Sequence, residues 1–196
     1  MGEGENVLVN EPANMKMVYN EDIVGEAKNQ LPVKSDDLLV AEKFVLINDG
    51  SLNDFKIPLV NLIDGQWVEE TVLLDKQLSK GENEFILEDF ASIDGRKVYI
   101  SIGNEVFGPV DLTKTYNIDE INSETFLKLV NNSADMQKGE TAVVACWIPN
   151  YEDTLIKSVE VFGSDEYVKD LKILYDNPEK TYQAFERCSM ICVTFE

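Results

Sequence analysis

The side chains that could do chemistry are carboxylates, lysines, tyrosines and cysteines, because the chain of 196 residues contains no histidine. This absence excludes Ser-His-Asp and Cys-His catalytic arrangements, the usual proton shuttle near neutral pH, and zinc sites with imidazole ligands. An enzyme would have to work with the remaining groups alone. We therefore expect a protein that is not an enzyme, with no catalytic residue and no cofactor.

Three cysteines could form a redox or metal group: Cys146, Cys188 and Cys192. An odd number leaves at least one thiol free or paired outside the chain, and with no secretory leader a reduced compartment is expected. On a strand, Cys188 and Cys192 would share a face but lie about 13 Å apart, too far for a disulfide. On a helix they would lie closer, and a fourth metal ligand would have to be an acid. We favour buried free thiols that pack as small hydrophobic residues.

Oxygen-bearing side chains alternate with other residues in the stretch 48–54, a spacing that suits calcium. The candidate ligands are Asp49, Asn53 and Asp54. Counted from Asp49, however, glycine is second rather than sixth, and Val60 stands where a twelfth-position glutamate would bind. We favour a loop without metal, so no metal site is predicted.

Three aromatic residues are candidates for contact with a carbohydrate or a protein, since aromatic side chains dominate binding hot spots. Trp147 lies inside an apolar run, and we expect it in the core. Trp67 follows a turn, and Tyr151 follows the apolar run. Trp67 and Tyr151 are therefore the predicted interaction residues.

The overall charge narrows the choice of partner. The chain has 37 acidic and 17 basic residues, which gives a formal net charge of -20. Nonspecific attraction to nucleic acid or to an anionic membrane is therefore not expected. The sequence has no apolar run long enough to cross a bilayer, and its first residues do not resemble a secretory leader.

The candidate side chains described above lie on or between short apolar runs that are separated by turn residues. These runs predict strands over 38–47, 55–63, 66–74, 84–87 and 97–102. Asp49-Gly50 and Asp94-Gly95 predict hairpin turns, because glycine adopts positive φ without steric cost. The run 38–47 suits a central strand, and Pro58 predicts an edge position or a bulge.

The second half begins after a predicted boundary in 103–117, where Gly108-Pro109 interrupts the pattern. The spacing of apolar residues predicts a short helix over 123–132. Further apolar runs cover 141–148, 155–162 and 167–175, and the last fits either a helix or a strand. We favour a hairpin formed with 181–185, followed by a final strand over 190–195.

The turn pattern of the first half resembles the bacterial immunoglobulin-like modules of the CARDB and fibronectin type III kind. The resemblance rests on Asn48 to Gly50 and on Lys80 to Phe85, which match the Asn-x-Gly loop and the Gly-Glu turn before a Phe-bearing strand. It covers residues 44–103. It implies a β-sandwich with a scaffold or adhesive role, and it implies no active site.

Together these patterns predict an all-β fold of one or two immunoglobulin-like β-sandwiches. An extended arm over 1–35 precedes a sandwich over 36–103, and 104–196 form a second β-rich region. We expect a non-catalytic structural or interaction protein that docks through its arm and sheet edges onto a larger assembly. A bacteriophage virion is the favoured setting, as a capsid decoration or tail-surface component.

The expected partners are copies of the chain in a homo-oligomer, or capsid and tail proteins, in the virion or the cytoplasm. The alternative is an extracellular adhesion or glycan-binding module whose leader has been removed. That alternative predicts an exposed aromatic platform near Trp67 or Tyr151.

Overall fold

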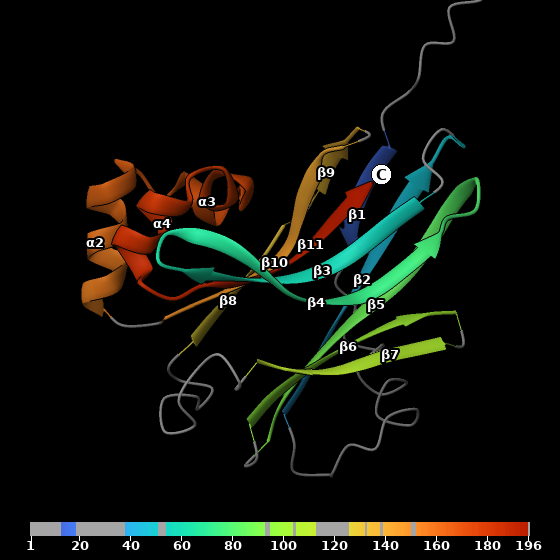
Figure 1. Ribbon diagram of the computed structural model, residues 1–196, viewed down its shortest axis with the longest axis horizontal. Coiled ribbons are helices and arrows are strands. Elements are labelled where there is room, and N and C mark those ends of the chain that lie inside the picture. Colours follow the sequence, from blue (N-terminus) through green and yellow to red (C-terminus); the bar gives the residue numbers. More distant parts are fainter. Residues whose placement is uncertain are drawn as a thin grey trace, which may run out of the picture.

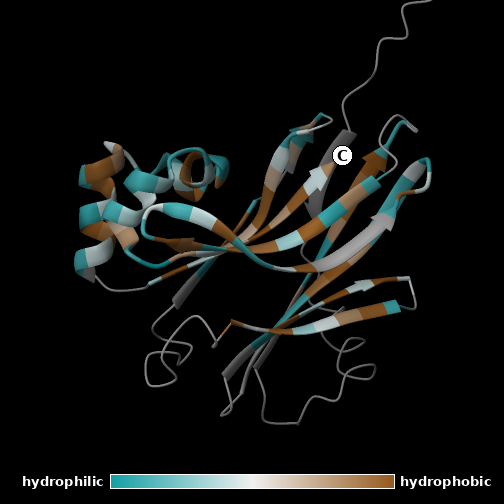
Figure 2. Cartoon of the chain, viewed as in Figure 1, coloured by the Kyte–Doolittle hydropathy of each residue, from teal (hydrophilic) through white to brown (hydrophobic). Residues whose placement is uncertain are grey.

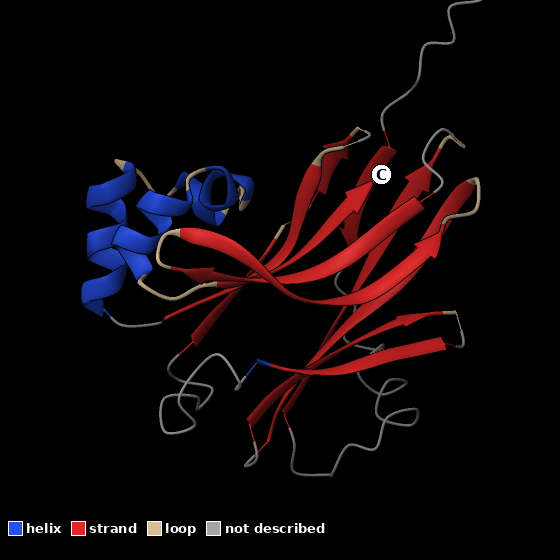
Figure 3. Ribbon diagram, viewed as in Figure 1, coloured by secondary structure: helices blue, strands red, loops and turns tan. Residues whose placement is uncertain are grey.

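Two antiparallel β-sheets face each other, and a group of short helices covers the outer face of one of them (Figure 1). The computed structural model describes residues 13–18, 38–50, 54–92, 95–103, 105–112, 126–131, 133–137, 139–149 and 152–195. Figure 3 shows the helices gathered at one end of the strands. The predicted all-β sandwich is confirmed.

Sheet A has six strands in the order β7-β6-β5-β2-β1-β9. Their bounds are Glu105–Asp111, Gly95–Ile102, Gly81–Ser92, Leu38–Asn48, Ala13–Val18 and Ser133–Met136, in that order. Sheet B has five strands in the order β4-β3-β11-β10-β8. Their bounds are Gln66–Gln77, Asp54–Ile63, Ser189–Phe195, Thr141–Pro149 and Phe126–Val130.

Two predictions about individual strands are confirmed by the structure. The run 38–47 lies in β2, which is central between β5 and β1, as predicted. Pro58 lies in β3 at a shift in the pairing with β4, because proline cannot donate to the ladder there. The predicted bulge is confirmed.

Of the two predicted Asp-Gly hairpins, one is confirmed and one is wrong. Gly95 pairs with Ser92 at the start of the β5–β6 hairpin, and residues 93 and 94 lie outside the described residues. After Asp49-Gly50 the chain crosses instead from β2 in sheet A to β3 in sheet B. Gly50 has φ +99°, and its N–H donates to Asn48 Oδ1 at 2.9 Å. This side-chain turn suits a corner as well as a hairpin.

Strands from both sides of the predicted boundary at 103/104 pair with each other. In sheet B, β3 pairs with β11, and in sheet A, β1 pairs with both β2 and β9. Residues 36–103 therefore do not complete a sandwich by themselves. Gly108-Pro109, which was expected to mark the boundary, is a cis peptide bond within the edge strand β7.

The predicted N-terminal arm contributes a strand to the sheet. Residues 13–18 form β1, which lies between β2 and β9. The rest of the predicted arm, 1–12 and 19–35, lies outside the described residues. Removing the arm would therefore remove a strand of sheet A.

The helix predicted over 123–132 is wrong, because 126–130 form β8, which pairs with β10. The hairpin predicted over 167–185 is also wrong. The chain there forms η3 (Glu166–Val168), α3 (Lys172–Asp176) and α4 (Pro178–Phe185), after α2 (Glu152–Phe162). Leu171, Ile173 and Tyr175 fit the spacing of a strand, whereas Leu171 and Leu174 fit that of a helix, and the helical conformation buries Leu171 and Leu174 completely against sheet B.

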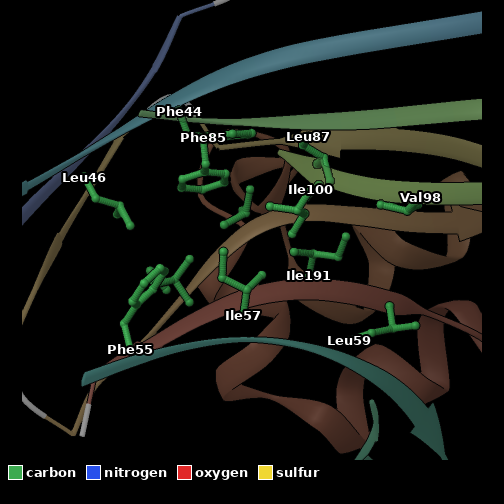
Figure 4. Packing of buried hydrophobic residues seen from close by; sticks show 14 of the residues in the cluster. Phe44, Leu46, Phe55, Ile57, Leu59, Phe85, Leu87, Val98, Ile100 and Ile191 are labelled. Carbon is green, nitrogen blue, oxygen red and sulfur yellow. The ribbon is translucent and has the colours of Figure 1, made fainter. Parts of the chain in front are cut away.

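Two hydrophobic cores hold these layers together. Between the sheets lies a core that includes Phe44, Phe85 and Ile191, with the two phenylalanine rings stacked at 5.0 Å (Figure 4). A second core lies between sheet B and the helices and includes Tyr167 and Phe185. Figure 2 shows apolar residues along both sheets, whereas each helix carries apolar and polar residues together. The helices are amphipathic covers for sheet B.

Candidate functional site

Trp147 lies in the core between the sheets, where it is 1% exposed. Its indole Nε1 donates a hydrogen bond to Asp89 Oδ2 at 3.2 Å. The prediction of a core residue is therefore confirmed. Tyr151, one of the two predicted interaction residues, lies outside the described residues.

Trp67, the other predicted interaction residue, attaches strand β4 to helix α3. Its Nε1 donates to the Tyr175 carbonyl oxygen at 2.8 Å, and the two rings stack with centroids 5.8 Å apart. The side chain is half-buried. Since the indole N–H and one ring face are used within the chain, Trp67 has a structural task here.

Three exposed apolar side chains lie near the turn beside Trp67, and we call them the tip patch: Ile63, Val68 and Tyr182. Their exposed fractions are 46%, 43% and 37%. Ile63 and Val68 share one face of the β3–β4 hairpin, because Val68 pairs with Asn61, two residues before Ile63. Tyr182 comes from α4, which lies beside the turn in Figure 1. Ile63 and Tyr182 line one cavity, whereas Val68 lies on the face of β4 opposite to Trp67, which packs on helix α3. Exposed apolar side chains on both sides of the turn favour a protein contact.

Asp64 and Gly65 make this turn possible. Both have positive φ, +49° and +76°, which the tight connection of β3 to β4 requires. A Cβ on Gly65 would lie 3.7 Å from Glu179 Cα, so the turn packs directly on α4. A cavity of 260 Å³ opens beside it, lined by Leu62, Ile63, Asp64, Tyr182, Glu186, Arg187 and Cys188.

Strand β4 continues the tip patch as a free sheet edge. It is 12 residues long, and β3 is its one neighbour among the described strands. An edge strand presents unpaired backbone N–H and C=O groups, to which another chain can add a strand. Val68, Glu69 and Glu70 are exposed along it. The two adjacent carboxylates discourage indiscriminate pairing and restrict which partners fit.

A buried charge cluster joins the two sheets: Glu42 on β2, Asp89 on β5, Lys128 on β8 and Trp147 on β10. Lys128 Nζ lies 2.5 Å from Glu42 Oε2 and 3.6 Å from Asp89 Oδ2. The three charged side chains are between 1% and 9% exposed. Lys128 Nζ also lies 5.7 Å from the centroid of the Trp147 ring, within the range of a cation–π contact.

Sequence analysis missed this cluster. Glu42 and Lys128 both lie inside apolar runs, which could have indicated that they are buried. Their contact was not predictable, because it joins residues that are 86 positions apart on two different sheets. Chemically, one ammonium group faces two carboxylates away from water. Such an arrangement fixes how the sheets are aligned, since separating the charges is costly in a medium of low polarity.

A second buried carboxyl lies on the other face of β5. Glu88 is 2% exposed and accepts a hydrogen bond from the Ser101 hydroxyl at 3.2 Å. Burial raises the pKa of Glu88 above its ordinary value near 4.5, and the Ser101 hydrogen bond opposes part of that rise. Tyr99 is paired directly opposite, and its pKa is raised by burial and then by the charge of Glu88.

The structure describes two of the three candidate calcium ligands. Asp54 is exposed at the start of β3, Asp49 is half-buried after β2, and Asn53 lies outside the described residues. Within the described ranges, no group of three or more cysteine, aspartate or glutamate side chains is arranged to hold a metal ion.

A second cavity, of 360 Å³, lies where α3 approaches β9 and β10, and acids and lysines both line it. Asn131 on its wall ties the helices to sheet B. Its Nδ2 donates to the Val143 carbonyl at 2.9 Å, and its Oδ1 accepts from the Leu171 N–H at 3.1 Å. Because its amide group is used in this way, the buried Asn131 has a structural task.

All three cysteines are buried free thiols, as the sequence predicted. They face the helices together in the second core, which places Cys188 and Cys192 on one face of the sheet as expected. The close approach of Cys146 to Cys188 was not predicted.

No protein-family model, no curated protein and no solved structure matches the chain. In the parts of the chain that the structure describes, no helix is long and apolar enough to cross a membrane. The assignment of a function therefore depends on the geometry described above.

Proposed function

We propose that this protein is a non-catalytic structural subunit that joins a larger protein assembly through the free edge of β4 and the adjoining tip patch. The observation that carries the proposal is a long edge strand, β4, that ends in exposed apolar side chains. Backbone pairing would supply affinity along the edge, and Ile63 and Val68 would supply apolar contact area. A bacteriophage virion is the assembly that we favour, with the sandwich on a capsid or tail surface.

The simplest such contact is between two copies of the chain. Two β4 edges can pair antiparallel about a twofold axis, and this would join two copies of sheet B into one continuous sheet. Each copy carries Glu69 and Glu70 on this edge and has a net charge of -20, so the two copies repel each other. Association should therefore strengthen as salt screens the repulsion, since the screening length falls from about 10 Å at 0.1 M to about 3 Å at 1 M.

Light scattering on the full chain tests the proposal. The wild type should have a mass above that of the 22.1 kDa monomer, with a larger oligomeric fraction at high salt. V68K should return the mass to that of the monomer, because it places two extra charges at the paired edge. The matched control is V106K on the edge strand β7 of sheet A, where Val106 is 41% exposed and a lysine should leave the mass unchanged.

Two results would contradict the proposal. One is a wild type that stays monomeric at every concentration and salt. The other is an equal loss of mass in both lysine variants, which would mean that the β4 edge has no special part in association.

A further inference from the structure

Cys146 on β10 and Cys188, the residue directly before β11, have their sulfur atoms 3.2 Å apart. The pairing of the strands causes this approach. Met190 lies directly opposite Cys146, so Cys188 stands two residues away on the same face of the sheet. Diagonal neighbours of this kind lie within reach of each other's side chains. A disulfide bond of about 2.05 Å requires the sulfurs to close by roughly 1.1 Å.

We propose that Cys146 and Cys188 are an oxidisable pair, which forms a disulfide when the protein meets a small disulfide oxidant such as oxidised glutathione. Cys192 lies on the same face and stays a thiol. The inference does not depend on the proposed function, because it concerns the second core rather than the β4 edge.

Access to the pair is through Cys188. This residue lines the 260 Å³ cavity beside the tip patch, together with Arg187. Asp64 and Glu186 line the same cavity, so charges of both signs surround the approach to the thiol. Because Cys188 lines this cavity, its sulfur would attack the oxidant first. Cys146, which does not line the cavity, would then attack the Cys188 sulfur.

The reaction balances in two exchanges. The Cys188 thiolate attacks one sulfur of glutathione disulfide, which forms a mixed disulfide and releases one glutathione. The Cys146 thiolate then attacks the Cys188 sulfur and releases the second glutathione. Two protein thiols lose two hydrogen atoms, which appear on the two glutathione molecules. Burial raises the pKa of Cys188 well above its ordinary value, so the first exchange should be slow at neutral pH and faster as pH rises.

The crosslink would span the whole helical layer. Residues 146 and 188 are 42 positions apart, and α2, η3, α3 and α4 all lie between them. Oxidation would tie both ends of this segment to adjacent strands of sheet B. The midpoint of thermal unfolding should rise, because the bond restricts the unfolded chain.

Intact-mass and peptide analysis of the full chain tests the proposal. The native protein is treated with oxidised glutathione, and remaining thiols are then alkylated in denaturant. We expect one alkylated thiol instead of three, a peptide linking Cys146 to Cys188, and the same link in C192S. C188S should lose the link, and reduction should restore three thiols and the lower unfolding midpoint in the wild type.

Three outcomes would overturn the proposal. The first is three free thiols in the native protein under conditions in which the denatured chain oxidises. The second is a stable mixed disulfide on Cys188 that never resolves. The third is a crosslink that involves Cys192 instead, which would place the reactive pair elsewhere in the core.

Discussion

Replacing Lys128 by methionine should be among the most damaging single changes in the sandwich. The substitution keeps the length of the side chain and removes the ammonium group that faces Glu42 and Asp89. Removing one partner of a buried ion pair typically costs 3–5 kcal/mol, roughly, because the remaining charge stays away from water. Trp147 still donates to Asp89, so we expect a loss near the lower limit, about 3 kcal/mol.

Lys43 provides a matched control. It makes an equally short contact with Glu84, 2.6 Å, but the two side chains are 29% and 54% exposed. A solvent-exposed ion pair of this kind contributes about 0–1 kcal/mol. K43M should therefore lower the free energy of unfolding by less than about 1 kcal/mol.

Urea unfolding of both variants, followed by tryptophan fluorescence, measures the difference. At pH 7 the loss in K128M should exceed the loss in K43M by about 2 kcal/mol or more. Equal losses in the two variants would refute the reasoning.

Two further predictions concern stability. W67F keeps the ring stack on Tyr175 but removes the hydrogen bond to its carbonyl oxygen, so the free energy of unfolding should fall by about 1–2 kcal/mol; an unchanged urea midpoint would show that water replaces the bond. For Glu88, the raised pKa means that the folded state holds its proton more tightly than the unfolded state does. The wild type should therefore lose stability relative to E88Q as pH rises above about 4.5, and parallel pH profiles of the two proteins would contradict this.

Local patterns were enough to predict most strands of the two sheets. Val98 and Ile100 alternate with polar neighbours, and both are completely buried. Strands β5 and β6 pair from Ser92 and Gly95 onward, where the dipeptide Asp94-Gly95 predicts a hairpin. Such features depend on residues close in the chain, so the sequence carries them directly.

The predictions were wrong or incomplete where contacts between residues far apart in the sequence determine the structure. Residues 126–130 have helical spacing, yet pairing with β10 makes them a strand. The run 167–175 has apolar residues at both helical and strand spacing, and the burial of Leu171 and Leu174 against sheet B favours the helix. The short distance between Cys146 and Cys188 depends on how β10 and β11 align, which no local pattern specifies. The contact between Lys128 and Glu42 likewise depends on the alignment of distant strands.

The central claim is that β4 is the edge through which this protein assembles, and the mass of the full chain in solution tests it most directly. At high salt the wild type and V106K should exceed the 22.1 kDa of the monomer, whereas V68K should not. A wild type that scatters as a monomer under all these conditions would contradict the claim.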